Sequence, residues 1–340
     1  MSLCVGSVSS YMKDYSIAYP GPSERTFRVW EMAERRGLKT AAKIQLNNSW
    51  EGAAVPYIPA LNLVDLHLRN LLDAKVRSVV VSWTLGGCPS TPNLLRLRDF
   101  IWKTEGAPRS LLDFARAVYG EGASGKVCMA WKLLSDALQK FPHNIPVLYY
   151  SPLHMGPANL LYSSYSDYRA TMVSFPYNDL SRWRGIYTED IFVEQFKKLS
   201  EDWAKGVDLL DGIEPPANRR QRAALKDLTG VARANYCHFR TTCLQACFII
   251  QRDRLYRLAG LDGIIRKNPE RAEVIKGILA ILAEEIELAK TLRLLARHDS
   301  RLGFEATQHY YYRAEDLMEK VLNCEALSDY FKRLLEEATR

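Results

Sequence analysis

Polar and apolar residues follow two alternating patterns over the first 106 residues of the chain. Three short stretches contain aromatic or β-branched residues, which favour strands. Each is followed by a stretch in which apolar residues recur every three or four positions, the spacing of amphipathic helices. The predicted strands are residues 11–20, 40–46 and 76–85, and the predicted helices are residues 23–37, 61–72 and 93–103. A strand–helix pattern that occurs three times predicts parallel βα units with right-handed crossovers.

From residue 107 onward the pattern is helical. Helices are predicted at 110–119, 126–139, 188–210, 218–258, from 268 onward and at 314–338, with a long ordered loop region rich in Tyr and Pro at 142–187. Long helices with apolar stripes and short connections are typical of antiparallel bundles. We therefore expect an α/β part followed by an all-α part, with a partial βα barrel over 1–106 and a helical domain over 107–340.

Two of the predicted strands end in polar and aromatic residues. Asn47, Asn48, Trp50 and Glu51 follow the strand 40–46, and Trp83 lies near the end of the strand 76–85. Ligands of parallel βα folds bind at the carboxyl ends of the strands. Indole faces stack on sugar rings and side-chain amides bond hydroxyl groups, so these residues predict a carbohydrate site. The alternatives are core tryptophans and asparagines that stabilise a turn.

Glu51 is the catalytic candidate of this segment. Glycosidic bonds are usually hydrolysed by two carboxyl groups that flank the bond, and residues 1–105 offer no second carboxylate at a predicted strand end. Glu51 could equally bind a sugar hydroxyl or pair with an arginine. Whether the chain catalyses hydrolysis by itself therefore stays open.

A second group of candidate ligand-binding residues lies late in the chain. Residues 304–313 contain Glu305, His309 and Tyr310, and on a helix the first two would share a face because they are four positions apart. The group either packs structurally or reaches the sugar site. No His or Cys set with metal-ligand spacing accompanies His309, and no dinucleotide or phosphate-loop motif occurs, so we expect no metal and no cofactor.

Composition narrows the class of protein. The 340 residues contain seven scattered cysteines and carry a net charge of +7. The odd number of cysteines and the lack of a signal peptide or long apolar run predict a cytoplasmic protein with no membrane segment. Residues 219–257 hold nine Lys or Arg against two acidic residues. A solvated helix face explains this excess, and binding to nucleic acid is the alternative.

Three stretches carry a resemblance to a known family. AAKIQLNNSWE, SVVVSWTLGGCPS and SRLGFEATQHYYYRAEDLMEKVLNCE together resemble the C-terminal part of bacterial glycoside-hydrolase-like proteins. These are (β/α)₈ barrels with a helical C-terminal region, distantly similar to hexosaminidases of family 20. The resemblance implies a tryptophan wall at Trp50 and Trp83, with Glu51 beside it.

The same resemblance limits what this chain can do. Catalysis in hexosaminidases depends on an adjacent Asp-Glu pair on a barrel strand, and no such pair stands at a predicted strand end here. Three βα units cannot close an eight-stranded barrel, so we expect a missing N-terminal half of the barrel or a second copy of the chain to complete it. A noncatalytic sugar- or protein-binding module and a basic helical nucleic-acid binder are the other hypotheses.

Overall fold

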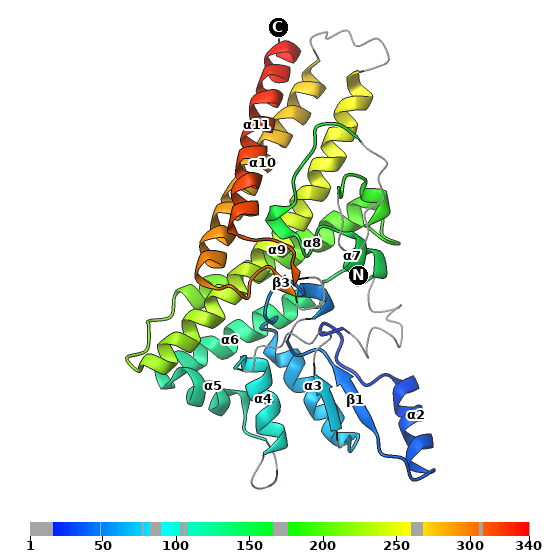
Figure 1. Cartoon of the computed structure of the whole chain (residues 1–340), viewed down its shortest axis with the longest axis vertical. Coiled ribbons are helices and arrows are strands. Elements are labelled where there is room, and N and C mark those ends of the chain that lie inside the picture. Colours follow the sequence, from blue (N-terminus) through cyan, green and yellow to red (C-terminus); the bar gives the residue numbers. More distant parts are fainter. Residues whose placement is uncertain are drawn as a thin grey trace. The chain divides into compact units, whose positions relative to one another are not determined.

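The computed structural model describes residues 16–47, 49–76, 78–81, 90–102, 106, 108–165, 176–259, 268–305 and 309–339. These residues are largely helical (Figure 1). The chain divides into two compact units. Unit 1 comprises residues 1–143, 198–236 and 305–309, and unit 2 comprises residues 144–197, 237–304 and 310–340. The helices expected after residue 106 are therefore shared between both units.

The helices agree closely with those predicted from periodicity. They are α2 (Glu24–Glu34), α3 (Leu61–Asp73), α4 (Pro92–Ile101), α5 (Leu111–Tyr119), α6 (Glu121–Leu138), α7 (Ile145–Tyr150), α8 (Glu189–Asp211), α9 (Arg219–Ala259), α10 (Pro269–His298) and α11 (Ala314–Thr339). Short 3₁₀ turns are η1 (Trp50–Gly52), η2 (Gly156–Ala158) and η3 (Leu180–Arg182). Side-chain caps begin two of these helices: the Ser23 hydroxyl accepts the Thr26 amide at the start of α2, and Asn268 caps α10.

Unit 1 contains a small parallel sheet. Strand β1 (Ala41–Ile44) pairs in parallel with β2 (Ser78–Val81), with Ala41 opposite Ser78, and α3 connects the two strands (Figure 1). This is the expected β–α–β crossover, followed by α4. Ala42 and Ile44 of β1 are buried, whereas Ser78 and Val80 are exposed, so one face of β2 is open to solvent.

The third expected strand is not found in the described part of residues 11–20. Residues 16–20 form bends and irregular backbone. The physical reason is that a side chain, and not a neighbouring strand, accepts the hydrogen bonds of this segment. The Ile17 amide donates to the Glu51 carboxylate at 3.1 Å, and the Ser16 hydroxyl donates to the same oxygen. The three parallel βα units therefore reduce to two parallel strands in the residues that the structure describes.

The helices of unit 1 pack closely around large aromatic side chains. Trp131 on α6 and Trp203 on α8 are fully buried, and the Trp203 indole donates to the Ala232 carbonyl at 2.8 Å. A Cβ atom at Gly206 would lie 2.6 Å from the Leu134 side chain, so only glycine allows α8 to approach α6 this closely. This core supports the sheet and the segments that follow its strands.

Unit 2 contains a helical bundle built from the second half of α9 with α10 and α11, which lie side by side (Figure 1). The apolar residues expected to face inward on α10 are Val274, Ile278, Ile281, Leu288 and Leu292, and all are buried except Ile281, which is half-buried. The expected long loop region holds only α7, η2 and η3 between residues 142 and 187, with 166–175 outside the described residues. Among the described helices, none carries an apolar stretch sufficient to cross a lipid bilayer.

Candidate functional site

The segment that follows β1 is fastened to the start of α4. The Asn93 side-chain amide donates to the Leu46 carbonyl at 2.7 Å and to the Ile58 carbonyl at 3.0 Å. The Thr91 hydroxyl, which caps α4, donates to Asn47 Oδ1 at 2.7 Å. The carboxyl end of β1 and the amino end of α4 therefore meet. This is the edge of a βα unit where ligands commonly bind, and the helix end adds positive partial charge.

Glu51 is the charged residue of this segment, and its side chain is completely buried. Its Oε1 atom accepts hydrogen bonds from the Ser16 hydroxyl and the Ile17 amide, and its Oε2 atom has no hydrogen-bond partner among the described residues. Burial raises the pKa of the Glu51 carboxyl above its usual value, with the hydrogen bonds acting in the opposite direction. None of the described residues forms an ion pair with Glu51, so burial favours the protonated form more than it would in an exposed glutamate.

The structure brings three of the predicted sugar-binding residues together after β1. Asn47, Trp50 and Glu51 are all nearly or fully buried, and Trp50 is only 9% exposed. Asn47 accepts a hydrogen bond from the Thr91 hydroxyl, which agrees with the alternative that this asparagine has a structural role. Asn48 and Trp83 lie outside the described residues. The burial of this group could not be foreseen from the sequence, because it depends on residues 16–18 covering Glu51.

The late group, which joins two predicted helices, forms two short strands. Residues Phe304–Glu305 form β3 and residues His309–Tyr310 form β4, which pair as a short two-stranded sheet. The idea that Glu305 and His309 share a helix face is therefore wrong. Gly303 has a positive φ of 82°, and its carbonyl accepts the Tyr311 amide at 2.7 Å, a turn that breaks the helical path.

The side chains of this late group divide by burial. Glu305 is buried, and Tyr310 is exposed with its ring between Phe304, at 5.2 Å between centroids, and the Arg313 guanidinium, 5.4 Å from the ring centre. The side chain of His309 lies outside the described part of the chain. Within the described residues, the hydrogen bonds of the Glu51 carboxylate go to Ser16 and Ile17 and not to this group.

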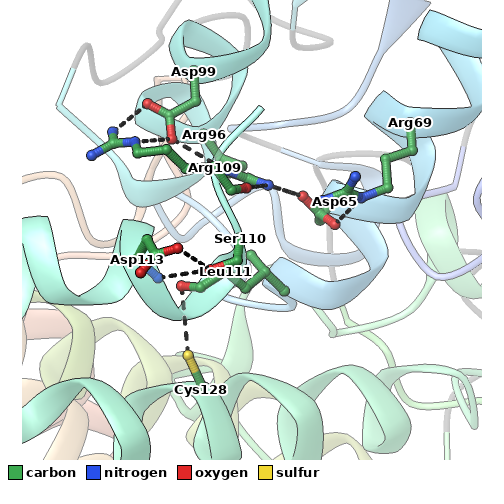
Figure 2. Close-up of polar contacts among 9 residues, drawn as sticks. All are labelled: Asp65, Arg69, Arg96, Asp99, Arg109, Ser110, Leu111, Asp113 and Cys128. Atoms are coloured by element: carbon green, nitrogen blue, oxygen red, sulfur yellow. Dashed lines mark hydrogen bonds and ion pairs between the residues drawn. The ribbon is translucent and has the colours of Figure 1, made fainter. Parts of the chain in front are cut away.

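A buried ion-pair network that the sequence did not reveal supports α4 (Figure 2). Arg96 is fully buried, and its guanidinium donates to Asp65 on α3 at 2.8 Å and 2.5 Å and to Asp99 at 3.2 Å. Asp65 also accepts from Arg69 at 2.7 Å, and Asp99 accepts from Arg109 at 3.0 Å. Each carboxylate thus has two arginines, which identifies the network as structural. It fixes α4, and therefore the cap at Thr91, against α3.

The basic residues of α9 are partly neutralised by acidic partners. Ion pairs join Arg233 to Asp211 at 2.5 Å, Arg240 to Glu284 at 2.5 Å, Arg252 to Asp253 at 2.7 Å and Arg254 to Glu270 at 2.6 Å. A nucleic-acid surface needs basic side chains that are free to contact phosphates. The pairing favours the solvated and structural interpretation of this run.

No set of three or more His, Cys, Asp or Glu side chains among the described residues is arranged to hold a metal ion. Comparisons with protein-family models, with curated proteins and with solved structures find no match to this chain. The case for a function therefore depends on the geometry at the end of β1 and on the sequence resemblance.

Proposed function

We propose that this chain is a carbohydrate-binding portion of a glycoside-hydrolase-type protein, and that residues 47–51 form one wall of its sugar site. The observation that carries the proposal is Glu51: a buried carboxyl without a cationic partner among the described residues, at the carboxyl end of a parallel strand and close to the start of a helix. A buried carboxyl whose pKa is raised by burial is costly for stability alone, and such perturbed groups concentrate at functional sites.

Glu51 has two roles open to it within this proposal. Its raised pKa is the property that a general acid of a glycosidase needs at neutral pH. Its hydrogen bonds to Ser16 and Ile17 make it a positioning residue that holds the chain before α2 over the strand end. Hydrolysis would need a second carboxyl about 5–10 Å away. We therefore assign sugar binding to this chain and leave hydrolysis to a completed site.

The aromatic part of the wall follows from the resemblance. Trp83 comes directly after β2, the neighbour of β1 in the sheet, so the carboxyl ends of both strands lie at the same edge. We propose that Trp83 stacks on a sugar ring. Stacking of this kind contributes through the large flat area of the indole.

The proposal is tested by calorimetric titration of the full chain with oligosaccharides of β-linked N-acetylglucosamine, glucose and galactose. Trp83→Ala is expected to weaken binding at least tenfold, because it removes the stacking face. Trp102→Ala is the matched control, since Trp102 is 71% exposed at the end of α4 and should bind sugar as the parent does. Absence of sugar binding by the parent chain, or equal loss in both variants, would rule the proposal out.

A noncatalytic sugar-binding module remains the alternative of a different class. Release of reducing ends from a bound oligosaccharide, lost in Glu51→Gln, would identify a hydrolase. Binding that depends on Trp83 with no release of product would identify the module.

A further inference from the structure

Unit 2 contains a small cavity that the proposed sugar site does not use. Its volume is about 70 Å³, several times the 10–15 Å³ that one water molecule needs. The second half of α9, the first turn of α10 and the last part of α11 contribute its walls. The cavity therefore has room for a ligand group larger than one water molecule.

Arg271 is the unusual residue of this cavity. It lies in the first turn of α10 and is only 7% exposed. Its side chain forms no hydrogen bond and no ion pair with any residue that the structure describes, and its Nε atom is buried without a partner. A buried guanidinium without an anion is strongly unfavourable, because its lost hydration is not replaced.

The acidic residue beside Arg271 does not compensate it. Glu270 pairs instead with Arg254 on α9 at 2.6 Å. The cavity also contains Arg252, which is fully buried but satisfied: it pairs with Asp253 at 2.7 Å and donates to the Asn178 carbonyl at 3.0 Å. The charges of Arg252 and Asp253 neutralise each other, so the charge that remains on the cavity wall is that of Arg271.

The remaining walls suit an anionic group that carries an organic part. Tyr256 and Tyr330 line the cavity and are both partly exposed, and the Tyr256 hydroxyl donates to the Ser163 carbonyl at 2.7 Å. Phe331 adds an apolar side. Arg271 itself lies in the first turn of α10, the end of the helix that carries positive partial charge.

We propose that this cavity is a binding site for a small oxyanion, namely the phosphate group of a small molecule, held by the Arg271 guanidinium. A guanidinium presents parallel N–H donors that match a phosphate in two-point hydrogen bonding. The phosphate belongs either to free inorganic phosphate or to a phosphate ester. The inference does not depend on the proposed sugar site, which lies in unit 1.

Calorimetric titration of the full chain with inorganic phosphate in a chloride buffer of constant ionic strength tests the site. The parent chain is expected to bind one phosphate saturably, and Arg271→Met is expected to weaken binding at least tenfold. Arg254→Gln is the matched control, because Arg254 is an exposed, paired arginine on the neighbouring α9, and its affinity should stay within about twofold of the parent. Arg271→Lys keeps the positive charge but loses the paired N–H donors of the guanidinium, so this variant should bind phosphate with intermediate affinity.

Circular dichroism and thermal melting of each variant show that the fold is retained before binding is compared. Tighter binding of a sugar phosphate than of inorganic phosphate identifies an ester as the ligand class, and equal or weaker binding identifies free phosphate. The proposal is overturned if the parent shows no saturable phosphate binding, if Arg271→Met binds as the parent does, or if acetate binds as tightly as phosphate.

Discussion

Two completely buried glutamates, one in each unit, are held in opposite ways. Glu285 in unit 2 lies 2.8 Å from the ammonium group of Lys320 and accepts from the Thr241 hydroxyl at 2.6 Å. Glu51 in unit 1 accepts hydrogen bonds from Ser16 and Ile17, which are neutral donors, and forms no ion pair with any residue that the structure describes. The first carboxylate is neutralised by a partner within the fold, whereas the second keeps an oxygen without a partner among the described residues.

The surroundings of Glu285 extend this contrast. The Lys320 ammonium also donates to the Asn159 carbonyl at 2.6 Å, and the Asn159 amide donates to Gln245, whose own amide donates to Thr241 at 2.8 Å. These hydrogen bonds therefore end at Thr241, the residue whose hydroxyl donates to Glu285. A buried polar network closed in this way specifies packing.

Two buried arginines repeat the same difference. Arg96 is surrounded by Asp65 and Asp99, whereas Arg271 has no anionic partner among the described residues. The lesson is that burial alone does not distinguish support from function in this molecule. The distinction is whether the fold supplies the opposite charge, and the predictions below test it.

The largest effect is expected at Lys320. Lys320→Met leaves Glu285 as an uncompensated buried charge and should lower the free energy of unfolding by about 3–5 kcal/mol. Urea denaturation measures the loss. The double variant Lys320→Met/Glu285→Leu removes both charges and should recover most of it. A single variant as stable as the parent would show that Glu285 is not charged in the folded state.

Arg96→Met should be the next most damaging change. It leaves Asp65 and Asp99 with one arginine each, so the expected loss is about 2 kcal/mol, less than at Lys320. Arg69→Met is the control: the Arg69 side chain is 42% exposed, so its loss should lower the free energy of unfolding by less than about 1 kcal/mol. Similar losses for both variants in urea denaturation would contradict the assignment of Arg96 as the centre of the network.

Glu51→Gln, unlike the two preceding variants, should make the protein more stable than the parent, and the difference should grow as pH rises. The folded protein binds the Glu51 proton more tightly than the unfolded chain, because burial raises the pKa of Glu51. The stability that this proton contributes is present below the unfolded pKa, near 4.3, and is lost as pH rises through the folded pKa. Between pH 4.3 and the folded pKa, the free energy of unfolding of the variant should therefore rise relative to that of the parent by up to about 1.4 kcal/mol per pH unit.

Paired urea denaturation curves of the parent and Glu51→Gln between pH 4 and 8 measure this gain. The buried His143 titrates in the same range, since burial lowers its pKa to about 4, but it is present in both proteins and cancels in the difference. A difference that does not change with pH would contradict a raised pKa for Glu51.

The smallest effect is expected at Arg271. In a buffer without phosphate, Arg271→Met removes an uncompensated buried charge and should raise the free energy of unfolding by about 1 kcal/mol. Thermal and urea denaturation detect the gain, and phosphate should reduce the difference by stabilising only the parent. Destabilisation by this variant without phosphate would indicate a partner for Arg271 within the fold.

Much of the helical structure was predictable from local signals. Apolar residues three and four positions apart predicted α3 and α10. The expected position of Asn47, Trp50 and Glu51 after a strand is also confirmed. These features depend on residues near one another in the chain.

The errors and omissions depend on contacts between distant residues. Residues 16–19 resemble a strand locally, but Glu51, about 35 positions later, takes the Ser16 and Ile17 donors. Arg96 and Asp65 are 31 positions apart and Lys320 and Glu285 about 35, so no local pattern predicts that they pair. The candidate site could be located from the sequence, but its burial and its missing counter-charge could not.

The most direct test of the account is a ¹³C NMR titration of the Glu51 side-chain carboxyl, assigned by its loss in Glu51→Gln, with and without a saturating oligosaccharide. We predict that the carboxyl keeps its proton well above pH 4.3, the ordinary value for glutamate, and that its signal shifts when sugar binds. A carboxyl that titrates near pH 4.3 and does not respond to any oligosaccharide would contradict both the neutral acid and the sugar site.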